Sequence, residues 1–258
     1  MTNKIIGIMG AMQEEIAGIV SLLEGKKEIS RGMRTYYKGL LNGIPTVVVF
    51  SRWGKVAAAT TVSTLILEFN ISELIFTGVA GAVHDDLKVG DIVIGSRLIQ
   101  HDMDARPIMP RFEIPLLGRT YFECPAGQLA VSIKAANELL NAFELRKVLS
   151  ENDLRSFNIV SPKLFVGEIA SGDKFFSATE DKRILVKNLP EVLCVEMEGA
   201  AVAQVCYEYD IPFSIIRTIS DTAGDESHID FQLFIKNISS VYSVELIKNI
   251  YGQLSGPM

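Results

Sequence analysis

The chain has 258 residues, and 48% of them are hydrophobic, which is enough apolar material for one large core. We therefore predict a single domain over residues 1–258. The formal net charge is −6 and no run of Lys and Arg is present, which argues against a nucleic-acid partner. No stretch of eighteen apolar residues occurs, so we also expect no membrane partner.

Short apolar runs alternate with amphipathic stretches along the whole chain. This alternation predicts a three-layer α/β sandwich, in which helices flank a central mixed, mostly parallel β-sheet. In chain order, we expect a strand at 4–9, a hairpin at 36–51, a helix at 55–69, strands at 73–81 and 91–100, a helix at 135–149, strands at 163–171 and 192–197, a helix at 198–209, a strand at 213–220 and a closing helix at 231–251.

Residues 101–127 break this alternation, because they hold four of the nine prolines and show little periodicity. A loop of this length inside a compact domain is usually a lid or an interface. The loop begins with "HDMD", His101 to Asp104, which resembles a metal cluster. Its spacing matches no standard metal site, so we expect no metal.

The three cysteines, Cys124, Cys194 and Cys206, are odd in number and form no CxxC pair. This usage favours a reduced intracellular setting, and we expect a cytoplasmic protein. The first apolar run, residues 5–12, lacks a cationic leader and a cleavage site, so we expect no targeting signal.

Ligands in open α/β sheets bind beyond the carboxyl ends of the strands, so the residues found there are candidates for a site. Carboxylates follow several strand ends, and aromatic side chains follow two of them. The polar and aromatic residues at these positions are Glu14, Glu15, Arg52, Trp53, Asp173, Phe175, Phe176, Glu196, Glu198, Ser220 and Asp221.

Each of these acids also has a purely structural interpretation. Glu14 and Glu15 fall in the first turn of a helix, where acids complement the macrodipole. Glu196 and Glu198 flank a helix start, and Asp221 precedes a turn, so all three are candidate caps. The aromatic side chains can likewise be ordinary core. Their coincidence at one sheet edge instead favours general acid–base chemistry on a planar ligand.

Seven segments carry a resemblance that covers residues 4 to 250. They are "GIMGAMQEE", "WGKVAAA", "TGVAGA", "KVGDIVIG", "SGDKF", "VEMEGAAVAQVC" and "IRTISD". Together they resemble the 5′-methylthioadenosine/S-adenosylhomocysteine nucleosidases of the nucleoside phosphorylase superfamily. The resemblance implies that fold, and hydrolysis of the bond between adenine and a 5′-thioribose. It also implies no metal or cofactor, a role in methionine salvage, and a homodimer whose 101–116 loop lies at the interface.

The resemblance assigns roles to individual residues. Glu15 matches the acid that activates water, and Asp221 matches the acid that protonates adenine N7. Glu198 matches the acid that binds the ribose hydroxyls. The other residues expected at the substrate are Met197 beside Glu198, Ser220 orienting Asp221, Arg217 near the ribose, Phe175 stacking on adenine, Phe176 offering backbone hydrogen bonds, and Met12, Trp53, Val79 and Phe231 in the ribose and 5′ pocket.

Three departures from the family pattern bear on specificity. Val79 stands where the family reads "TGSAGG" and has a hydroxyl. Trp53 stands where it has a small aliphatic residue in "GIGK". Residues 145–164 form a longer segment. The first two changes are expected to reshape the 5′ pocket or its preference.

Three alternative functions stay open. A phosphorylase would need arginines for phosphate, and Arg52 and Arg217 keep that possibility. Glu14 and Glu15 oppose it, because they occupy a turn that would otherwise offer N–H groups to an anion. A hydrolase of another purine nucleoside, such as a futalosine-type compound, fits the changes at Val79 and Trp53. An inactive nucleoside sensor is opposed by the intact acids.

Overall fold

The computed structural model describes residues 4–223 and 231–255. In this part of the chain, ten strands form one sheet in the order β10-β6-β8-β9-β5-β1-β4-β3-β2, with β7 beside β6. The strands are β1 (Ile6–Gly10), β2 (Glu24–Arg31), β3 (Arg34–Leu41), β4 (Ile44–Phe50), β5 (Glu73–Ala82), β6 (Ile92–Gln100), β7 (Tyr121–Glu123), β8 (Leu164–Ser171), β9 (Val192–Glu196) and β10 (Phe213–Asp221).

The sheet is mixed, as predicted. Parallel pairings join β1 to β4 and β5, β5 to β10, and β8 to β6 and β9. Antiparallel pairings connect β2, β3 and β4 as a meander, and join β6 to β7 and β10, and β5 to β9. The parallel strands β1, β5 and β10 therefore end side by side, with β9 reaching the end of β5.

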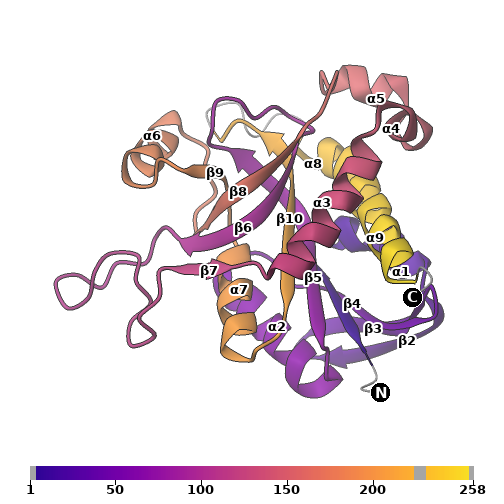
Figure 1. The fold of residues 1–258 in the computed structure, drawn as a ribbon, viewed down its shortest axis with the longest axis horizontal. Helices are drawn as coiled ribbons and strands as arrows, with labels where there is room; N and C mark the ends of the chain where they lie inside the picture. The colour runs from indigo at the N-terminus through magenta and orange to yellow at the C-terminus, as the bar shows by residue number, and fades with distance from the viewer. Residues whose placement is uncertain (1–3, 224–230, 256–258) are drawn as a thin grey trace.

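Helices cover both faces of this sheet, which gives the predicted three layers (Figure 1). The helices are α1 (Gln13–Ser21), α2 (Lys55–Phe69), α3 (Ala126–Leu140), α4 (Ala142–Val148), α5 (Glu151–Ser156), α6 (Thr179–Asn188), α7 (Gly199–Glu208), α8 (Phe231–Phe234) and α9 (Ser240–Leu254). Helices α2 and α7 pack together on one face, and α1 and α3 pack on α9 on the other.

The alternation of side chains along each strand explains how one sheet packs against helices on both of its faces. Val47 and Val49 of β4 are buried in the cluster that includes α2 and α7. Val48, between them, is buried in the cluster that includes α1, α3 and α9. Successive side chains of a strand point to opposite faces, so a run of apolar residues fills two cores at once. The unalternating apolar strands of the sequence are thus buried on both faces.

Two predicted helices differ from the observed ones. The helix predicted at 135–149 is divided, because Asn141 takes an extended backbone (φ −56°, ψ 124°) between α3 and α4. Helix α3 also begins earlier, at Ala126, directly after Pro125. The closing helix contains a π-helical turn, Ile235–Ser239, between α8 and α9. The sequence has neither Gly nor Pro at this position, but Asn is a favoured N-cap residue, and the Asn141 carbonyl accepts a hydrogen bond from the Leu145 N–H at 2.9 Å at the start of α4.

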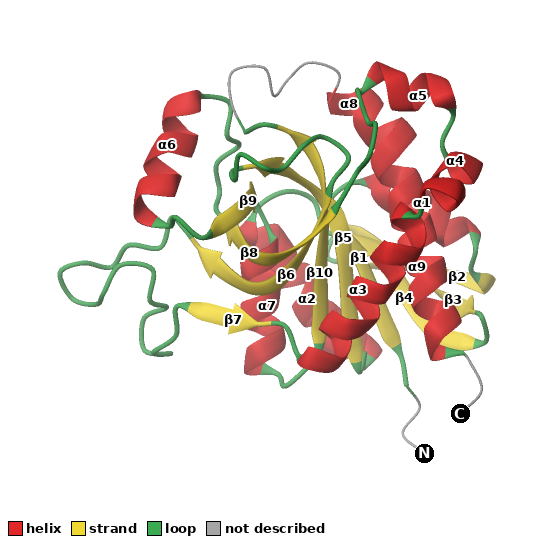
Figure 2. Ribbon diagram, turned by 45° about the horizontal axis from the view of Figure 1, so that its top comes forward, coloured by secondary structure: helices red, strands yellow, loops and turns green. Residues whose placement is uncertain are grey.

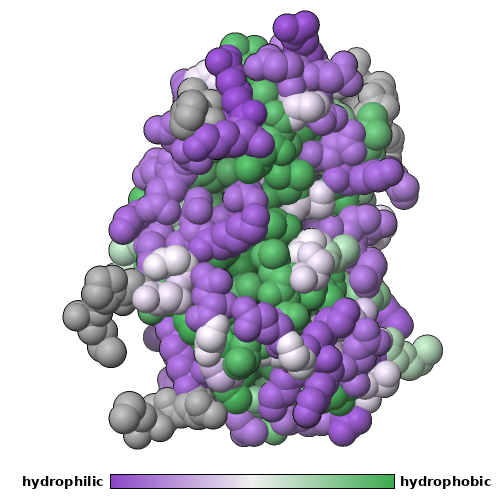
Figure 3. Space-filling model, turned by 90° about the vertical axis from the view of Figure 1, so that its right-hand side faces the viewer, coloured by the Kyte–Doolittle hydropathy of each residue, from purple (hydrophilic) through white to green (hydrophobic). Residues whose placement is uncertain are grey.

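The helical face formed by α9 and its neighbours is mostly polar, with apolar side chains showing in a strip between charged ones (Figure 3). On another side of the molecule, the segment between β6 and β7 extends away from the body (Figure 2). It carries two highly exposed apolar side chains, Ile108 at 86% and Leu116 at 97%. Within the described residues, no helix combines the length and apolar character needed to cross a membrane.

Candidate active site

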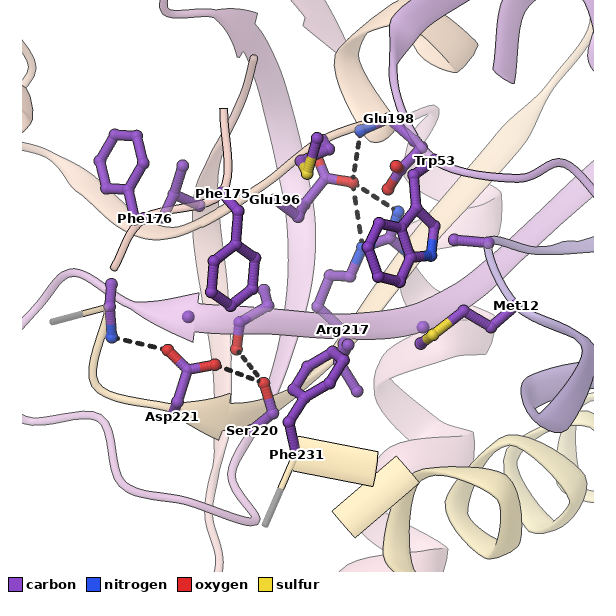
Figure 4. A pocket seen from close by; sticks show the side chains of 18 of the residues that line it. Met12, Trp53, Phe175, Phe176, Glu196, Glu198, Arg217, Ser220, Asp221 and Phe231 are labelled. Carbon is purple, nitrogen blue, oxygen red and sulfur yellow. Dashed lines mark hydrogen bonds and ion pairs between the residues drawn. The ribbon is translucent and has the colours of Figure 1, made fainter. Parts of the chain in front are cut away.

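A cleft of about 660 Å³ opens where β1, β5, β9 and β10 end (Figure 4). All twelve residues predicted for the site line it. They are Met12, Glu15, Trp53, Val79, Phe175, Phe176, Met197, Glu198, Arg217, Ser220, Asp221 and Phe231. The grouping arises because the parallel strands β1, β5 and β10 direct their carboxyl ends to one edge of the sheet, where β9 ends in antiparallel pairing with β5. The roles of these side chains remain predictions.

Glu15 is fully buried at the start of α1, and its two oxygens have different surroundings. Oε2 accepts hydrogen bonds from the backbone N–H of Ala11 at 2.6 Å and of Met12 at 2.9 Å. Among the described residues, Oε1 has no hydrogen-bond partner of regular geometry, although the Val79 amide is near enough to the carboxylate to oppose the rise in its pKa. The helix-cap interpretation therefore applies to one oxygen, and the other is left available at the cleft. Glu14, by contrast, is exposed, as expected.

Burial also changes the acidity of Glu15. Loss of solvent raises its pKa from 4.5 to about 7, against the opposing effects of the Met12 amide and the Arg217 charge. A carboxyl with this pKa exchanges its proton near neutral pH, which is the range in which a general acid or base works best.

Two glycines of "TGVAGA" leave room for the acids on either side of β5. A Cβ at Gly78 would lie 3.0 Å from Glu15 Oε1, and a Cβ at Gly81 would lie 2.9 Å from Asp221 Oδ1. Larger residues at these positions would displace the carboxylates. The glycines of this motif thus make room for the two carboxylates, and they do not form a phosphate-binding loop.

Glu198 lies at the N-cap position of α7 and is buried at the cleft. Its Oε1 accepts a hydrogen bond from the Gly54 N–H at 2.7 Å. Burial, together with the negative charge of Glu196, raises its pKa to about 8. Glu15 contributes to the same shift, so the two carboxylates of the cleft interact.

Glu196 is a cleft residue that the sequence analysis left as a possible cap. It does cap α7, because the Gly199 N–H donates to its carboxylate at 2.7 Å. It also forms a buried ion pair with Arg217, with Nη2 2.8 Å from Oε2, and Ser171 Oγ donates to it. The two acids of "VEME" therefore have different roles. Glu196 binds the Gly199 amide, the Arg217 guanidinium and the Ser171 hydroxyl, whereas Glu198 faces the cleft.

Arg217 is 1% exposed, and each of its three guanidinium nitrogens donates a hydrogen bond. Besides Glu196, it donates to the carbonyls of Phe76 at 3.3 Å and Ile216 at 3.0 Å, and it lies over the Phe76 ring. A guanidinium held in this way is neutralised and fixed in place. It stabilises the wall of the cleft and has no free edge for an anion.

Asp221 ends β10 and is partly exposed. Ser220 Oγ donates to Oδ2 at 2.7 Å, and the Ala223 N–H donates to Oδ1 at 2.8 Å. Figure 4 shows these bonds on opposite oxygens of the carboxyl group. The predicted contact between Ser220 and Asp221 is present, and it fixes the direction in which the carboxyl group points.

Aromatic side chains frame the mouth of the cleft. Phe175 and Phe231 meet edge to face, with ring centroids 6.0 Å apart. Trp53 is 58% exposed, so its interpretation as a core residue is wrong. These rings offer flat apolar surfaces to a planar ligand.

The "HDMD" segment shows no metal-binding geometry. Asp102 pairs with Lys55, and Asp104 pairs with Arg106 and Arg111. No group of three or more His, Cys, Asp or Glu side chains in the described part of the chain is placed to hold a metal.

Comparison with known proteins agrees with this geometry. Residues 5–244 match the phosphorylase superfamily. A 5′-methylthioadenosine/S-adenosylhomocysteine nucleosidase of Staphylococcus aureus is 32% identical over 97% of this chain and 100% of its own length. An aminodeoxyfutalosine nucleosidase of Helicobacter pylori is 34% identical over 96% of this chain and 98% of its own.

Solved structures give the same result. The methylthioadenosine/S-adenosylhomocysteine nucleosidase of Colwellia psychrerythraea, in complex with adenine, superposes with a TM-score of 0.85. It is 33% identical and covers 98% of this chain and 96% of its own. The chain belongs to the phosphorylase superfamily, and within it to the family of the 5′-methylthioadenosine/S-adenosylhomocysteine nucleosidases. It is an N-glycosidase.

Proposed function

We propose that this protein hydrolyses the N-glycosidic bond of 5′-methylthioadenosine and S-adenosylhomocysteine, releasing adenine and the 5′-thioribose. The observation that carries the proposal is the set of acids in one cleft. Glu15, Glu198 and Asp221 all line it, and the cations that line it among the described residues, Arg217 and Lys174, are both paired with carboxylates. Such a cleft suits a cationic sugar and disfavours a second anionic reactant.

The leaving base sets the first requirement. Adenine leaves poorly as an anion, so an acid must protonate it as the bond to the sugar breaks. Asp221 is the proposed donor to adenine N7, because Ser220 and the Ala223 amide fix its direction. Phe175, beside it at the mouth, is the proposed stacking surface for the base.

The attacking water sets the second requirement. Glycosidic cleavage proceeds through an oxocarbenium-like state, to which water adds as the base departs. Glu15 is the proposed base, because Oε1 is buried at the cleft and has no hydrogen-bond partner of regular geometry among the described residues. Its pKa of about 7 lets it accept a proton from water and pass it on within each cycle.

The ribose must be held between these two groups. Glu198 is the proposed acceptor for the sugar hydroxyls, because one of its oxygens is fixed by Gly54 and the other is not. Its negative charge, when ionised, also stabilises positive character on the sugar. Met12, Met197 and Phe231 are proposed to surround the ribose and its 5′ substituent.

Phosphorolysis is the less favoured reaction for this cleft. It needs cationic side chains that are free to hold phosphate at the sugar. Arg217 is occupied by Glu196, and Arg52 donates to the Met33 carbonyl and does not line the cleft. Hydrolysis therefore fits the site better.

A second candidate substrate is aminodeoxyfutalosine, the compound named for the Helicobacter pylori relative. Val79 and Trp53, which depart from the pattern expected of the family, both line the cleft. We propose that these two side chains contact the 5′ substituent and so affect which substrate is preferred.

The setting of the reaction belongs to the same proposal. We propose one domain, a cytoplasmic homodimer and a role in methionine salvage. The exposed Ile108 and Leu116 support a partner on the 101–116 loop. The buried, free thiols of Cys124, Cys194 and Cys206 support a reducing compartment. Sedimentation showing a monomer at assay concentration would remove the dimer.

One experiment tests the function directly. The protein is incubated with methylthioadenosine, S-adenosylhomocysteine and aminodeoxyfutalosine, with and without phosphate, and the released base and sugar are identified. We expect free adenine and an unphosphorylated sugar at a rate that phosphate does not change. A phosphate requirement with a sugar 1-phosphate product would replace hydrolysis by phosphorolysis. The ranking of the three compounds decides the substrate.

A further inference from the structure

Helix α2 begins directly after the cleft residue Trp53 without an acid of its own to cap it. Its N-cap residue is Gly54, and its first turn contains no acidic side chain. Two carboxylates from distant parts of the chain accept its first amides instead. Asp173 Oδ1 accepts from the Lys55 N–H at 2.8 Å, and Glu198 Oε1 accepts from the Gly54 N–H at 2.7 Å.

The Lys55 side chain enters the same group of contacts. Its Nζ donates to Asp102 Oδ1 at 2.6 Å and to Gln100 Oε1 at 3.1 Å. Asp102 Oδ2 in turn accepts from the Asp173 N–H at 2.9 Å. Lys55, Asp102 and Asp173 therefore close a ring of three hydrogen bonds, which we call the clamp. The clamp joins the start of α2 to the segments that follow β6 and β8.

The positive charge of Lys55 stabilises the negative charge of Asp102 within the clamp. Burial opposes ionisation of Asp102, but the bonds from Lys55 and from the Asp173 amide outweigh it and lower the pKa of Asp102. The side chain of Lys55 is only 17% exposed and that of Asp102 33%, so solvent screens this pair incompletely.

None of the three clamp residues lines the cleft, but each lies one contact or two residues away from a residue that does. Lys55 follows Gly54, whose amide holds Glu198. Asp173 precedes Phe175 by two residues. Beside Asp102, the His101 ring packs edge to face on Phe176, with centroids 5.3 Å apart. The clamp thus connects the wall that carries Glu198 with the wall that carries the aromatic residues.

We propose that Lys55, Asp102 and Asp173 are positioning residues, which hold Glu198 and the 175–176 segment at a fixed separation across the cleft. The inference rests on the proposed function, in which Glu198 binds the ribose and Phe175 the base. A nucleoside is gripped at both of these parts, so their spacing decides how well it binds in a reactive arrangement.

Two substitutions at one position test the clamp. Asp173→Ala removes the acceptor of the Lys55 amide, whereas Asp173→Asn keeps an oxygen there. We expect the KM of the Ala variant to rise roughly 3- to 10-fold, the range for a lost helix cap, with a smaller change in kcat. The Asn variant stays close to the unsubstituted protein. Glu180→Ala removes an exposed carboxylate paired with Arg183, and as a control leaves both constants unchanged.

A second measurement is independent of catalysis. Trp53 is the sole tryptophan, and it lies two residues before Lys55. Its fluorescence anisotropy in the protein without ligand should fall in Asp173→Ala and in Asp102→Ala. It should not change in Asp173→Asn or Glu180→Ala.

The outcomes separate the clamp from the proposed function. An unchanged KM in Asp173→Ala, whether or not the unfolding temperature drops, overturns the positioning role. An unchanged Trp53 anisotropy in both Ala variants overturns the clamp. Failure of the unsubstituted protein to release a base from any nucleoside overturns the proposed function instead, and the anisotropy still decides whether the clamp holds this wall.

Discussion

The proposed base and the proposed acid of the cleft, Glu15 and Asp221, differ in burial and in hydrogen bonding. Glu15 is fully buried, with one oxygen bonded to amides and the other without a hydrogen-bond partner of regular geometry among the described residues. Asp221 is partly exposed, and each of its oxygens accepts a hydrogen bond. Burial raises the pKa of Glu15 into the range in which it can exchange a proton near neutral pH. The two hydrogen bonds to Asp221 fix the direction in which that carboxyl group points.

The largest expected effect comes from removing the acid. Asp221→Asn keeps the size of the side chain and an oxygen for the Ala223 amide, but it cannot donate a proton to adenine. We expect kcat to fall by about 10³–10⁴ with little change in KM, as measured by adenine release. Asp85→Asn, at a surface carboxylate paired with Lys182, is the control and should be unaffected. Near-normal turnover by the Asp221 variant would remove this residue from the acid role.

Changing the proposed base should have a smaller effect on rate. Glu15→Gln keeps an oxygen for the Ala11 and Met12 amides, so the start of α1 is retained, but it cannot take a proton from water. We expect kcat to fall by about 10²–10³ in the same assay. The neighbouring Glu14→Gln should match the unsubstituted protein, because Glu14 is exposed. Equal losses in the two variants would contradict the division of roles.

The pH dependence sharpens the comparison further. Burial raises the pKa of Glu15 to about 7 and that of Glu198 to about 8, and the two carboxylates interact. If Glu15 works ionised, kcat/KM falls by about tenfold per pH unit as the pH drops below this range. This acidic limb of the pH profile reports the apparent pKa values of the two coupled carboxylates together. Glu198→Gln should move the limb to lower pH, because it removes the group with the higher pKa from the pair. A limb near pH 4.5 in the unsubstituted protein would show that burial does not govern Glu15.

Stability should change in the opposite direction from activity at Glu15. Its folded pKa, about 7, is above the ordinary 4.5, so its stabilising contribution is complete below pH 4.5 and is lost as pH rises through 7. Above pH 7 the buried charge costs on the order of 3 kcal/mol, which Glu15→Gln removes. We expect the variant to unfold at a higher temperature at pH 8, with the difference shrinking toward pH 5. Equal unfolding temperatures at pH 8 would contradict this.

The composition of the cleft was predictable, because it follows from where strands end. Each strand leading to Glu15, Val79, Glu198 and Asp221 reads as an apolar run. The carboxyl ends of the parallel strands β1, β5 and β10 meet at one edge, and the antiparallel strand β9 reaches the same edge by pairing with the end of β5. The distribution of hydrogen bonds was not predictable. Arg217 had candidate partners on several strands, and only the packed structure shows that Glu196 takes it.

The elements missed by sequence reasoning have different physical causes. Strand β2 lies at the edge of the sheet and all but one of its residues are exposed, so it shows no apolar run. The break at Asn141 falls within a stretch of continuous helical periodicity, so the periodicity alone does not show it. The clamp was not visible in the sequence because Lys55, Asp102 and Asp173 lie far apart in the chain.

The ion pair between Arg217 and Glu196 also determines which way the chemistry can run under the proposed function. A sugar 1-phosphate keeps an activated bond at C1′, from which the nucleoside can be rebuilt, whereas a free sugar does not. Because the guanidinium is already neutralised, the cleft has no free cation to bind phosphate. Cleavage by water is therefore effectively irreversible. The cell would thus clear these nucleosides at a rate set by their own supply and not by its phosphate level.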